Sequence, residues 1–153
     1  MPKLDMQSDA GTALVRVGKV GVGKGDEKAL DDYFNNDDYV FHGPDGELDY
    51  PGLKAFFASL RRALEGYACE RHDLIVKDHM IGARTQMSGR FTAPLQDQKF
   101  GLIEPNGQLV KLEIINFFRY DDKGKLVEEW VQYDNLGWYK QLGVDLVPKG
   151  KSK

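Results

Sequence analysis

The feature that most constrains this chain is a pair of alternating runs joined by a short turn, between residues 110 and 134. Successive side chains of a β-strand point to opposite faces. The first run therefore places on one face Val110, Leu112, Ile114, Asn116, Phe118 and Tyr120. The second run places on one face Leu126, Glu128, Trp130, Gln132 and Asp134. Polar groups in an apolar face are costly to bury unless they are used or satisfied, so this hairpin is where function is expected.

The turn predicts how the two runs pair. A three-residue loop over residues 122–124 pairs Asp121 with Lys125 and places a glycine where a left-handed residue is favoured. In this register Asn116 lies opposite Trp130. We therefore expect the polar residues of both runs to lie on the same side of the sheet.

The remaining sequence predicts helices first and strands afterwards. Helical spacing or end signals place helices over residues 8–20, 26–34, 51–64 and 136–142. Apolar runs place further strands over residues 39–42, 68–76 and 80–92. This order indicates an α+β fold, with helices packed on one side of a mostly antiparallel sheet. We expect one domain over residues 1–153, with a poorly defined N-terminal helix in residues 1–25 and a disordered basic tail in residues 147–153.

Composition argues against several classes of partner. The formal net charge is −3 and the pI is about 5.6, so the chain lacks the basic surface that nucleic acid or an anionic membrane requires. No apolar run approaches the ~20 residues of a membrane span. The single cysteine, Cys69, precludes an internal disulfide. The N-terminus has no signal-peptide pattern, so the expected location is the cytoplasm.

Two features resemble known sites without completing them. Residues 18–25 nearly match the phosphate-binding loop G-x-x-x-x-G-K-[S/T], but Gly25 stands where the magnesium-binding hydroxyl should be. A glycine-loosened helix end is the favoured interpretation. His72 and His79 have no second histidine or cysteine at ligand spacing, which argues against structural zinc. We expect neither metal nor cofactor.

The order of several segments resembles the SnoaL-like polyketide cyclases of the nuclear transport factor 2-like superfamily. The segments that carry the resemblance are YVFHGP (39–44), PGLKAFFASL (51–60), GLIEPNG (101–107), INFFRY (115–120), KLVEEWVQYD (125–134) and LGWYKQLG (136–143). The resemblance implies a cone-shaped α+β barrel, in which the strongly curved sheet encloses a small-molecule cavity. It also implies homodimers formed through the convex face of the sheet.

The resemblance further implies a ring closure by intramolecular aldol condensation, without metal or organic cofactor. Such chemistry needs a carboxylate in a partly dry pocket and donors that face the developing oxyanion. The candidate acid/base group is Asp134, and Asn116 and His42 are the candidate donors to a carbonyl of a small apolar ligand. The expected substrate-binding residues are Trp130, Gln132, Phe118, Phe57 and Tyr67.

Each polar candidate also has a structural alternative. Asp134 directly precedes a predicted helix and could cap it. Asn116 could be a buried amide satisfied by backbone, and His42 could bond only within its turn. Family members often carry aspartate at the position of Asn116 and histidine at that of Glu129. These departures leave fewer titratable groups in the expected cavity.

Three functions therefore stay open. The first is a cofactor-free cyclase, isomerase or dehydratase that acts on a small carbonyl compound. The second is a non-catalytic member that holds an apolar ligand. The third is a hydrolase of the epoxide-hydrolase type, in which Asp134 would position a water molecule.

Overall fold

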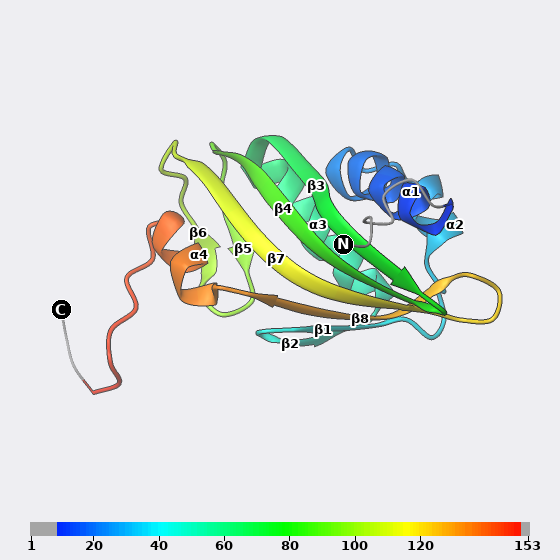
Figure 1. Cartoon of the computed structure of the whole chain (residues 1–153). Coiled ribbons are helices and arrows are strands. Elements are labelled where there is room, and N and C mark those ends of the chain that lie inside the picture. The colour runs from blue at the N-terminus through cyan, green and yellow to red at the C-terminus, as the bar shows by residue number, and fades with distance from the viewer. Residues whose placement is uncertain (1–8, 151–153) are drawn as a thin grey trace.

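The computed structural model describes residues 9–150, and its central element is a curved six-stranded sheet (Figure 1). The strand order is β2-β1-β8-β7-β4-β3. The strands of this sheet are β1 (Val40–Gly43), β2 (Gly46–Leu48), β3 (Leu64–Lys77), β4 (Met80–Phe91), β7 (Leu109–Tyr120) and β8 (Leu126–Tyr133). All neighbours pair antiparallel except β1 and β8, which are parallel. The predicted α+β fold with a curved, mostly antiparallel sheet is confirmed.

In the described part of the chain, four α-helices form within the ranges predicted for them, give or take a residue at their ends. They are α1 (Asp9–Arg16), α2 (Glu27–Tyr33), α3 (Tyr50–Ala63) and α4 (Asn135–Gln141). Asp26 caps α2 by accepting from the Ala29 amide at 3.1 Å, and Asp49 caps α3 by accepting from the Gly52 amide at 2.8 Å. Figure 1 shows α3 behind the long strands, while α1 and α2 lie beside β3. These helices close the concave side of the sheet.

The glycine-rich segment differs from its prediction. The helix predicted over residues 8–20 was expected to fray into a loop, but α1 continues as a π-helix, η1 (Val17–Gly23); residue 8 lies outside the described residues. Glycine permits this because η1 packs closely on β3. A Cβ on Gly18 would lie 3.4 Å from the Cys69 carbonyl oxygen. The near match to a phosphate-binding loop is thus part of a helical cover.

The predicted pairing of the main hairpin is wrong beyond its turn. Asp121 does donate its amide to the Lys125 carbonyl at 2.9 Å, as the three-residue loop requires. A register shift then follows between Arg119 and Tyr120, so that Asn116 pairs with Val131 instead of Trp130. A one-residue shift moves every later side chain to the other face. The inward residues of β8 beyond the bulge are therefore Glu129, Val131 and Tyr133.

Several shorter features were not predicted. The sequence did not predict strand β2. Nor did it predict the separate hairpin formed by β5 (Leu95–Asp97) and β6 (Gly101–Ile103). Strand β3 begins at Leu64, earlier than expected. Of the tail predicted to be disordered, residues 151–153 lie outside the described residues, and residues 147–150 form neither helix nor strand.

Two buried clusters fill the space between the sheet and the helices. One joins the first three helical segments to the middle of the sheet, and the other joins the end of α3 to α4 and the β5–β6 hairpin. The alternation predicted for β7 is confirmed, because the buried residues are Val110, Leu112, Ile114, Asn116 and Phe118. Among the described residues, none of the helices has the length and apolar character needed to span a membrane.

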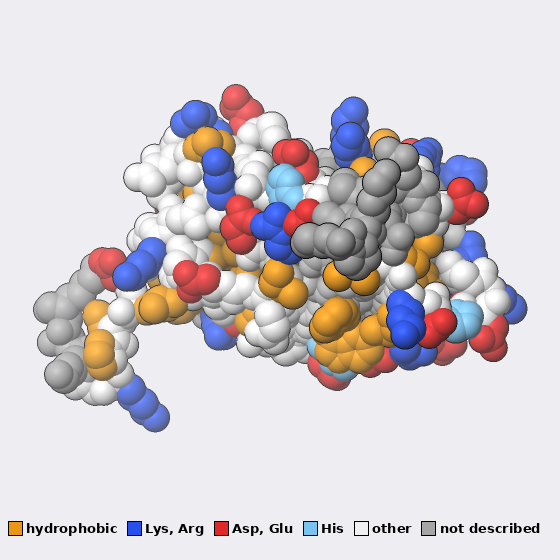
Figure 2. Space-filling view, in the orientation of Figure 1, with side chains coloured by type: hydrophobic (Ala, Val, Ile, Leu, Met, Phe, Trp, Pro, Cys, Tyr) orange, Lys and Arg blue, Asp and Glu red, His pale blue; other side chains and the backbone are white. Residues whose placement is uncertain are grey.

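The outer face of the sheet carries an apolar stripe across its strands. Ile75 pairs with Gly82, Gly82 with Phe117, and Phe117 with Trp130. Ile75 is 66% exposed, Phe117 54% and Trp130 37%. We call Ile75, Phe117 and Trp130 the convex stripe. Figure 2 shows hydrophobic side chains on the face of the sheet that is turned toward the viewer.

Candidate functional site

An inner cavity lies between the concave face of the sheet and the helices. Its free volume is about 30 Å³, which is room for a few atoms, whereas ligand pockets usually measure about 300–1,000 Å³. Most of its lining is apolar, with Phe56, Phe57, Met87, Phe118 and Val131 among the lining residues. A larger ligand enters only if flexible side chains such as Met87 move.

Three polar side chains line the same cavity: Arg71 from β3, Asn116 from β7 and Glu129 from β8. Glu129 is only 7% exposed, yet its carboxylate is well supplied with donors. The Tyr39 hydroxyl donates to Glu129 Oε1 at 2.7 Å, and the Asn116 amide donates to the same carboxylate. Burial raises the pKa of Glu129 above its ordinary value, while Arg71, Tyr39 and Asn116 oppose the rise. The result is a buried carboxyl group that is held in place by its neighbours.

The donors toward Glu129 form a directed chain. Arg71 Nη1 donates to Thr85 Oγ1 at 2.9 Å, and the Thr85 hydroxyl donates to Asn116 Oδ1 at 2.9 Å. Because its oxygen accepts from Thr85, the Asn116 side chain directs its NH₂ group toward Glu129. Asn116 is thus satisfied by side chains, not by backbone as the structural alternative proposed. This chain of hydrogen bonds orients the Glu129 carboxylate, which is its last acceptor.

A tyrosine pair lies near Arg71, where this chain of hydrogen bonds begins. The hydroxyls of Tyr33 and Tyr120 hydrogen-bond each other in a short contact. Burial raises the pKa of Tyr33 to about 12, and burial also raises the pKa of Tyr39 well above its ordinary value. Both hydroxyls are therefore protonated at neutral pH, and that of Tyr39 donates to Glu129.

An outer cavity adjoins the inner one. Phe41, Phe56 and Tyr133 line both, so these three side chains form the wall between them. The outer cavity has a free volume of about 60 Å³ and is also lined by Asp45, Gln96, Asp97 and Gln98. It lies at the end of the molecule near β5, β6 and α4 (Figure 1). The outer cavity is the more polar of the two cavities.

Three of the predicted site residues line the inner cavity: Asn116, Phe118 and Phe57. Tyr67 lies one step behind the lining, because its hydroxyl donates to the sulfur of Met87 at 3.0 Å. The predicted apolar part of the site is thus largely assembled in one place.

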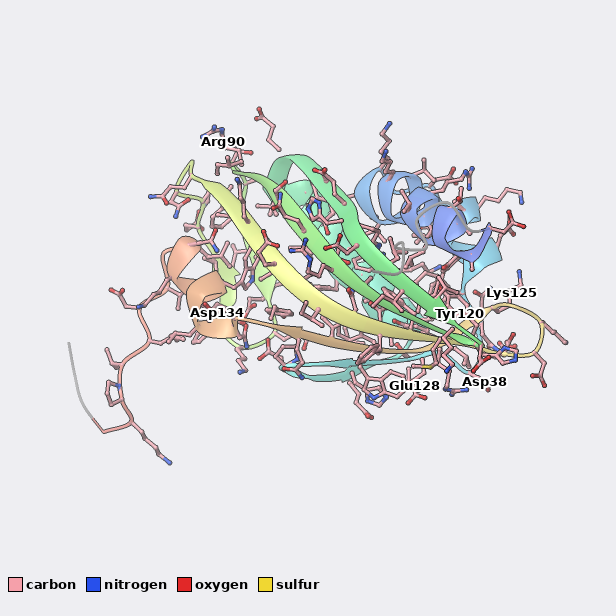
Figure 3. All side chains as sticks on the ribbon, viewed as in Figure 1. Asp38, Arg90, Tyr120, Lys125, Glu128 and Asp134 are labelled. Atoms are coloured by element: carbon pink, nitrogen blue, oxygen red, sulfur yellow. The ribbon has the colours of Figure 1, made fainter. Side chains whose placement is uncertain are left out.

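Asp134 lines neither cavity. Its Oδ1 accepts from the Gly137 amide at 2.9 Å, which makes it the N-cap of α4. Figure 3 shows Asp134 where β8 meets α4, at the opposite end of the sheet from Tyr120. The capping alternative is therefore the one that the structure contains, and the placement of Asp134 inside the cavity was wrong.

His42, Trp130 and Gln132 lie outside the cavity as well. The His42 ring lies between Glu47, 2.7 Å from Nδ1, and Glu128, 2.7 Å from Nε2. It stacks on Trp130 with ring centroids 5.4 Å apart. Trp130 and Gln132 are exposed side chains of β8. Their expected inward placement was wrong because the register shift turned this part of the strand over.

The inward polar residues that were not predicted from the sequence are Glu129, Tyr39, Thr85 and Arg71. Glu129 drew attention only as a departure from the family pattern, at a position that often holds histidine. A register with the bulge would have turned it inward, but nothing in the turn sequence signals that bulge. The other usable signal is that Arg71, a charged residue, occurs in the same strand as the apolar residues Cys69 and Leu74.

This arrangement can carry out general acid/base chemistry. A carboxyl group in a dry cavity can exchange a proton with a substrate carbon or oxygen when burial moves its pKa toward neutrality. The hydrogen bonds from Tyr39 and Asn116 fix the direction in which Glu129 presents its oxygens.

Comparison with protein-family models gives a match to the SnoaL-like polyketide cyclases over residues 15–142. Comparison with curated proteins gives no match.

Comparison with solved structures gives several similar folds. TsrD from Streptomyces laurentii is 25% identical, with a TM-score of 0.74; the match covers 90% of this chain and 97% of TsrD. AclR from Streptomyces galilaeus, described as a candidate hydroxylase, is 16% identical, with a TM-score of 0.72 and coverage of 89% and 96%. IdmH from Streptomyces antibioticus, described as a candidate polyketide cyclase, is 19% identical, with a TM-score of 0.69 and coverage of 89% and 99%.

Proposed function

Because the chain belongs to the SnoaL-like polyketide cyclase family, we propose that it closes a ring in a small carbonyl compound by acid/base chemistry, with Glu129 as the proton-transfer group. The observation that carries this proposal is the position of Glu129. It is a buried carboxyl group that lines the inner cavity and accepts hydrogen bonds from Tyr39 and Asn116. It thus replaces Asp134 as the candidate acid/base residue.

The proposed reaction is an intramolecular aldol addition. The ionised Glu129 removes a proton from the carbon next to a carbonyl group, which leaves an enolate. The enolate carbon then attacks a second carbonyl carbon of the same molecule and forms the new C–C bond. The resulting alkoxide takes the proton back from Glu129, so the product is an isomer of the substrate.

The raised pKa of Glu129 suits both halves of this cycle. A carboxylate with an ordinary pKa is a weak base toward carbon, whereas burial raises the pKa of Glu129, strengthens its carboxylate as a base and keeps its protonated form populated to higher pH. The apolar lining keeps bulk water away from the enolate. Phe56, Phe57 and Phe118 would then contact the hydrocarbon part of the substrate.

The test is enzyme-dependent uptake of solvent deuterium next to a carbonyl. A panel of aromatic diketones, with the two carbonyl groups spaced to close a six-membered ring, is followed by ¹H NMR in D₂O against an enzyme-free blank. Ring-closed isomers of unchanged mass are sought by mass spectrometry in parallel reactions in H₂O. We expect Glu129→Gln to lower the rate by about 10²-fold or more, since general base catalysis contributes on that order. The matched control is Asp134→Asn, which keeps the α4 cap and should keep the rate.

A Glu129→Gln variant with the wild-type rate would remove Glu129 from the mechanism. Should the wild-type protein bind members of the panel without any deuterium uptake or ring closure, the non-catalytic ligand-binding alternative would replace the cyclase proposal.

We also propose that the protein forms a homodimer through the convex stripe. Its members are aligned across adjacent strands and leave large apolar side chains in solvent. Phe117 covers Gly82, where a Cβ would lie 3.0 Å from its ring, so the stripe is flat at this point. A second copy of the same face would bury this apolar surface.

A further inference from the structure

Arg71 is a buried cation whose surroundings leave it incompletely satisfied. The residue is 9% exposed, and its guanidinium lies over the Phe118 ring, 5.2 Å from the centroid. Nη1 donates to Thr85, but Nε is buried without a hydrogen-bond partner among the described residues. None of the ion pairs formed by the described residues includes Arg71.

Such an arrangement is costly in a folded protein. Buried charges are normally paired, because the interior solvates them poorly. Glu129 lies close enough to interact electrostatically with Arg71, but the two side chains form no ion pair among those of the described residues. Each time Glu129 takes up a proton, the inner cavity keeps the arginine charge without a compensating anion.

The unpartnered Nε is packed against the glycine-rich segment. A Cβ on Gly18 of η1 would lie only 3.2 Å from it, so glycine lets η1 lie close to the guanidinium. Arg71 itself lines the inner cavity, together with Val17 and Val22 of η1. The glycine-rich segment therefore contributes to the cavity, although not as a phosphate-binding loop.

We propose that Arg71 is the anion-binding group of the inner cavity, and that the natural ligand presents a carboxylate or enolate oxygen to its guanidinium. An enolate oxygen would arise only during the proposed reaction, so this enolate source of the anion rests on the proposed function. A carboxylate carried by the ligand, the carboxylate source, would bind without turnover. In either case an anionic oxygen in the cavity compensates the buried charge of the Arg71 guanidinium.

The two cavities allow such a ligand to be longer than the inner cavity. The anionic end would occupy the space near Arg71, and the remainder would pass Phe41, Phe56 and Tyr133 into the outer cavity. The carboxylates of the outer cavity are already partnered. Asp45 pairs with Lys99 at 2.7 Å, and Asp97 accepts from the Tyr139 hydroxyl at 2.9 Å.

The proposal is tested with small aromatic probes that differ only in charge. Benzoate and benzamide are titrated into the full chain near neutral pH, and their dissociation constants are measured by ligand-observed NMR. 4-Nitrophenol is titrated separately and followed by the absorption band of its phenolate form, which imitates an enolate. We expect benzoate to bind about tenfold or more tightly than benzamide, as a charge-assisted hydrogen bond predicts. Bound nitrophenol should be shifted toward the phenolate.

The variants are Arg71→Met, which removes the guanidinium, and Arg84→Met as a matched control. Arg84 is an arginine of the neighbouring strand that pairs with Asp73 at the surface. Arg71→Met should lose the preference for benzoate and the phenolate shift, while Arg84→Met keeps both. The comparison of the two probes in the wild-type protein does not depend on either variant folding.

Equal binding of benzoate and benzamide by the wild-type protein, together with an unshifted nitrophenol, would overturn the proposal. So would a failure of both benzoate and nitrophenol to bind, or an Arg71→Met variant that folds and keeps the anion preference. None of these results depends on turnover, so they are separate from the Glu129→Gln test. A response to nitrophenol alone would assign the enolate source, and a response to benzoate alone the carboxylate source.

Discussion

The Tyr39 hydroxyl donates to Glu129 Oε1 at 2.7 Å and thereby links the start of β1 to the buried carboxyl group of β8. β1 and β8 are parallel neighbours, so this contact depends on a pairing between segments about 90 residues apart in the chain. The hydrogen bond favours the ionised form of Glu129 and opposes the effect of burial on its pKa.

Removing this hydroxyl should therefore strengthen Glu129 as a base. In Tyr39→Phe the ionised carboxylate loses one donor, so we expect the pKa of Glu129 to rise further. The acidic limb of the pH–rate profile for deuterium uptake should move to higher pH by a measurable amount. An unchanged limb would contradict the link between Tyr39 and the proton-transfer group. Tyr33→Phe, which removes a hydroxyl from the neighbouring tyrosine pair, is the matched control.

The stability of the protein should depend on pH through Glu129. Its pKa is raised in the folded state, so folding retains a proton that the unfolded chain releases. Stability from this group is fully present below the ordinary glutamate pKa. It is lost as the pH rises toward the folded-state pKa and is constant above that value.

Glu129→Gln removes this pH-dependent contribution to the free energy of unfolding and keeps the shape of the side chain. We therefore expect the variant to gain stability relative to the wild type as the pH rises from about 4.5, the ordinary glutamate value. Urea unfolding at several pH values measures the difference. A wild-type advantage that grows with pH would show that Glu129 is held as a stabilising anion instead.

Asp134 should affect stability more than chemistry. As the N-cap of α4 it accepts from the Gly137 amide, and asparagine can replace it in that role. Asp134→Ala should lower the free energy of unfolding by about 0.5–2 kcal/mol, whereas Asp134→Asn should be nearly neutral. Thermal and urea denaturation distinguish the two. Loss of deuterium uptake in a stably folded Asp134→Asn variant would restore Asp134 to the mechanism.

The convex stripe should control the oligomeric state. Phe117→Asp places a charge in the middle of the proposed interface, so we expect the dimer to dissociate at micromolar concentration. Sedimentation equilibrium measures the change. The control is Leu102→Asp, which alters an exposed leucine of the separate β5–β6 hairpin. A monomeric wild-type protein, or a dimer that tolerates Phe117→Asp, would contradict the interface.

Much of the fold was predictable because it follows from patterns within short segments of the sequence. The helix around residues 51–64 has proline in its first turn and apolar residues at helical spacing, and β7 alternates strictly. The parallel pairing of β1 with β8 was not predictable, because it joins distant segments without a local signal. Strands β2, β5 and β6 are too short to show a period.

The site was predictable in part, for a related reason. Asn116, Phe118 and Phe57 were identified because period-two and helical spacing place them correctly. Glu129 was missed because one bulge between Arg119 and Tyr120 inverts the faces of β8. Arg71 was missed because its burial depends on η1, whose glycines indicate a loop more readily than a π-helix.

The most direct test of the account is a titration of Glu129 itself. The carboxyl carbons of glutamate are labelled with ¹³C in the intact protein, and Glu129→Gln assigns the resonance by its disappearance. We expect the pKa of this carboxyl group to lie above the ordinary glutamate range, and to be higher still in Tyr39→Phe. A Glu129 that titrates at or below that range would be too weak a base at its working pH, and the proposed proton transfer would be contradicted.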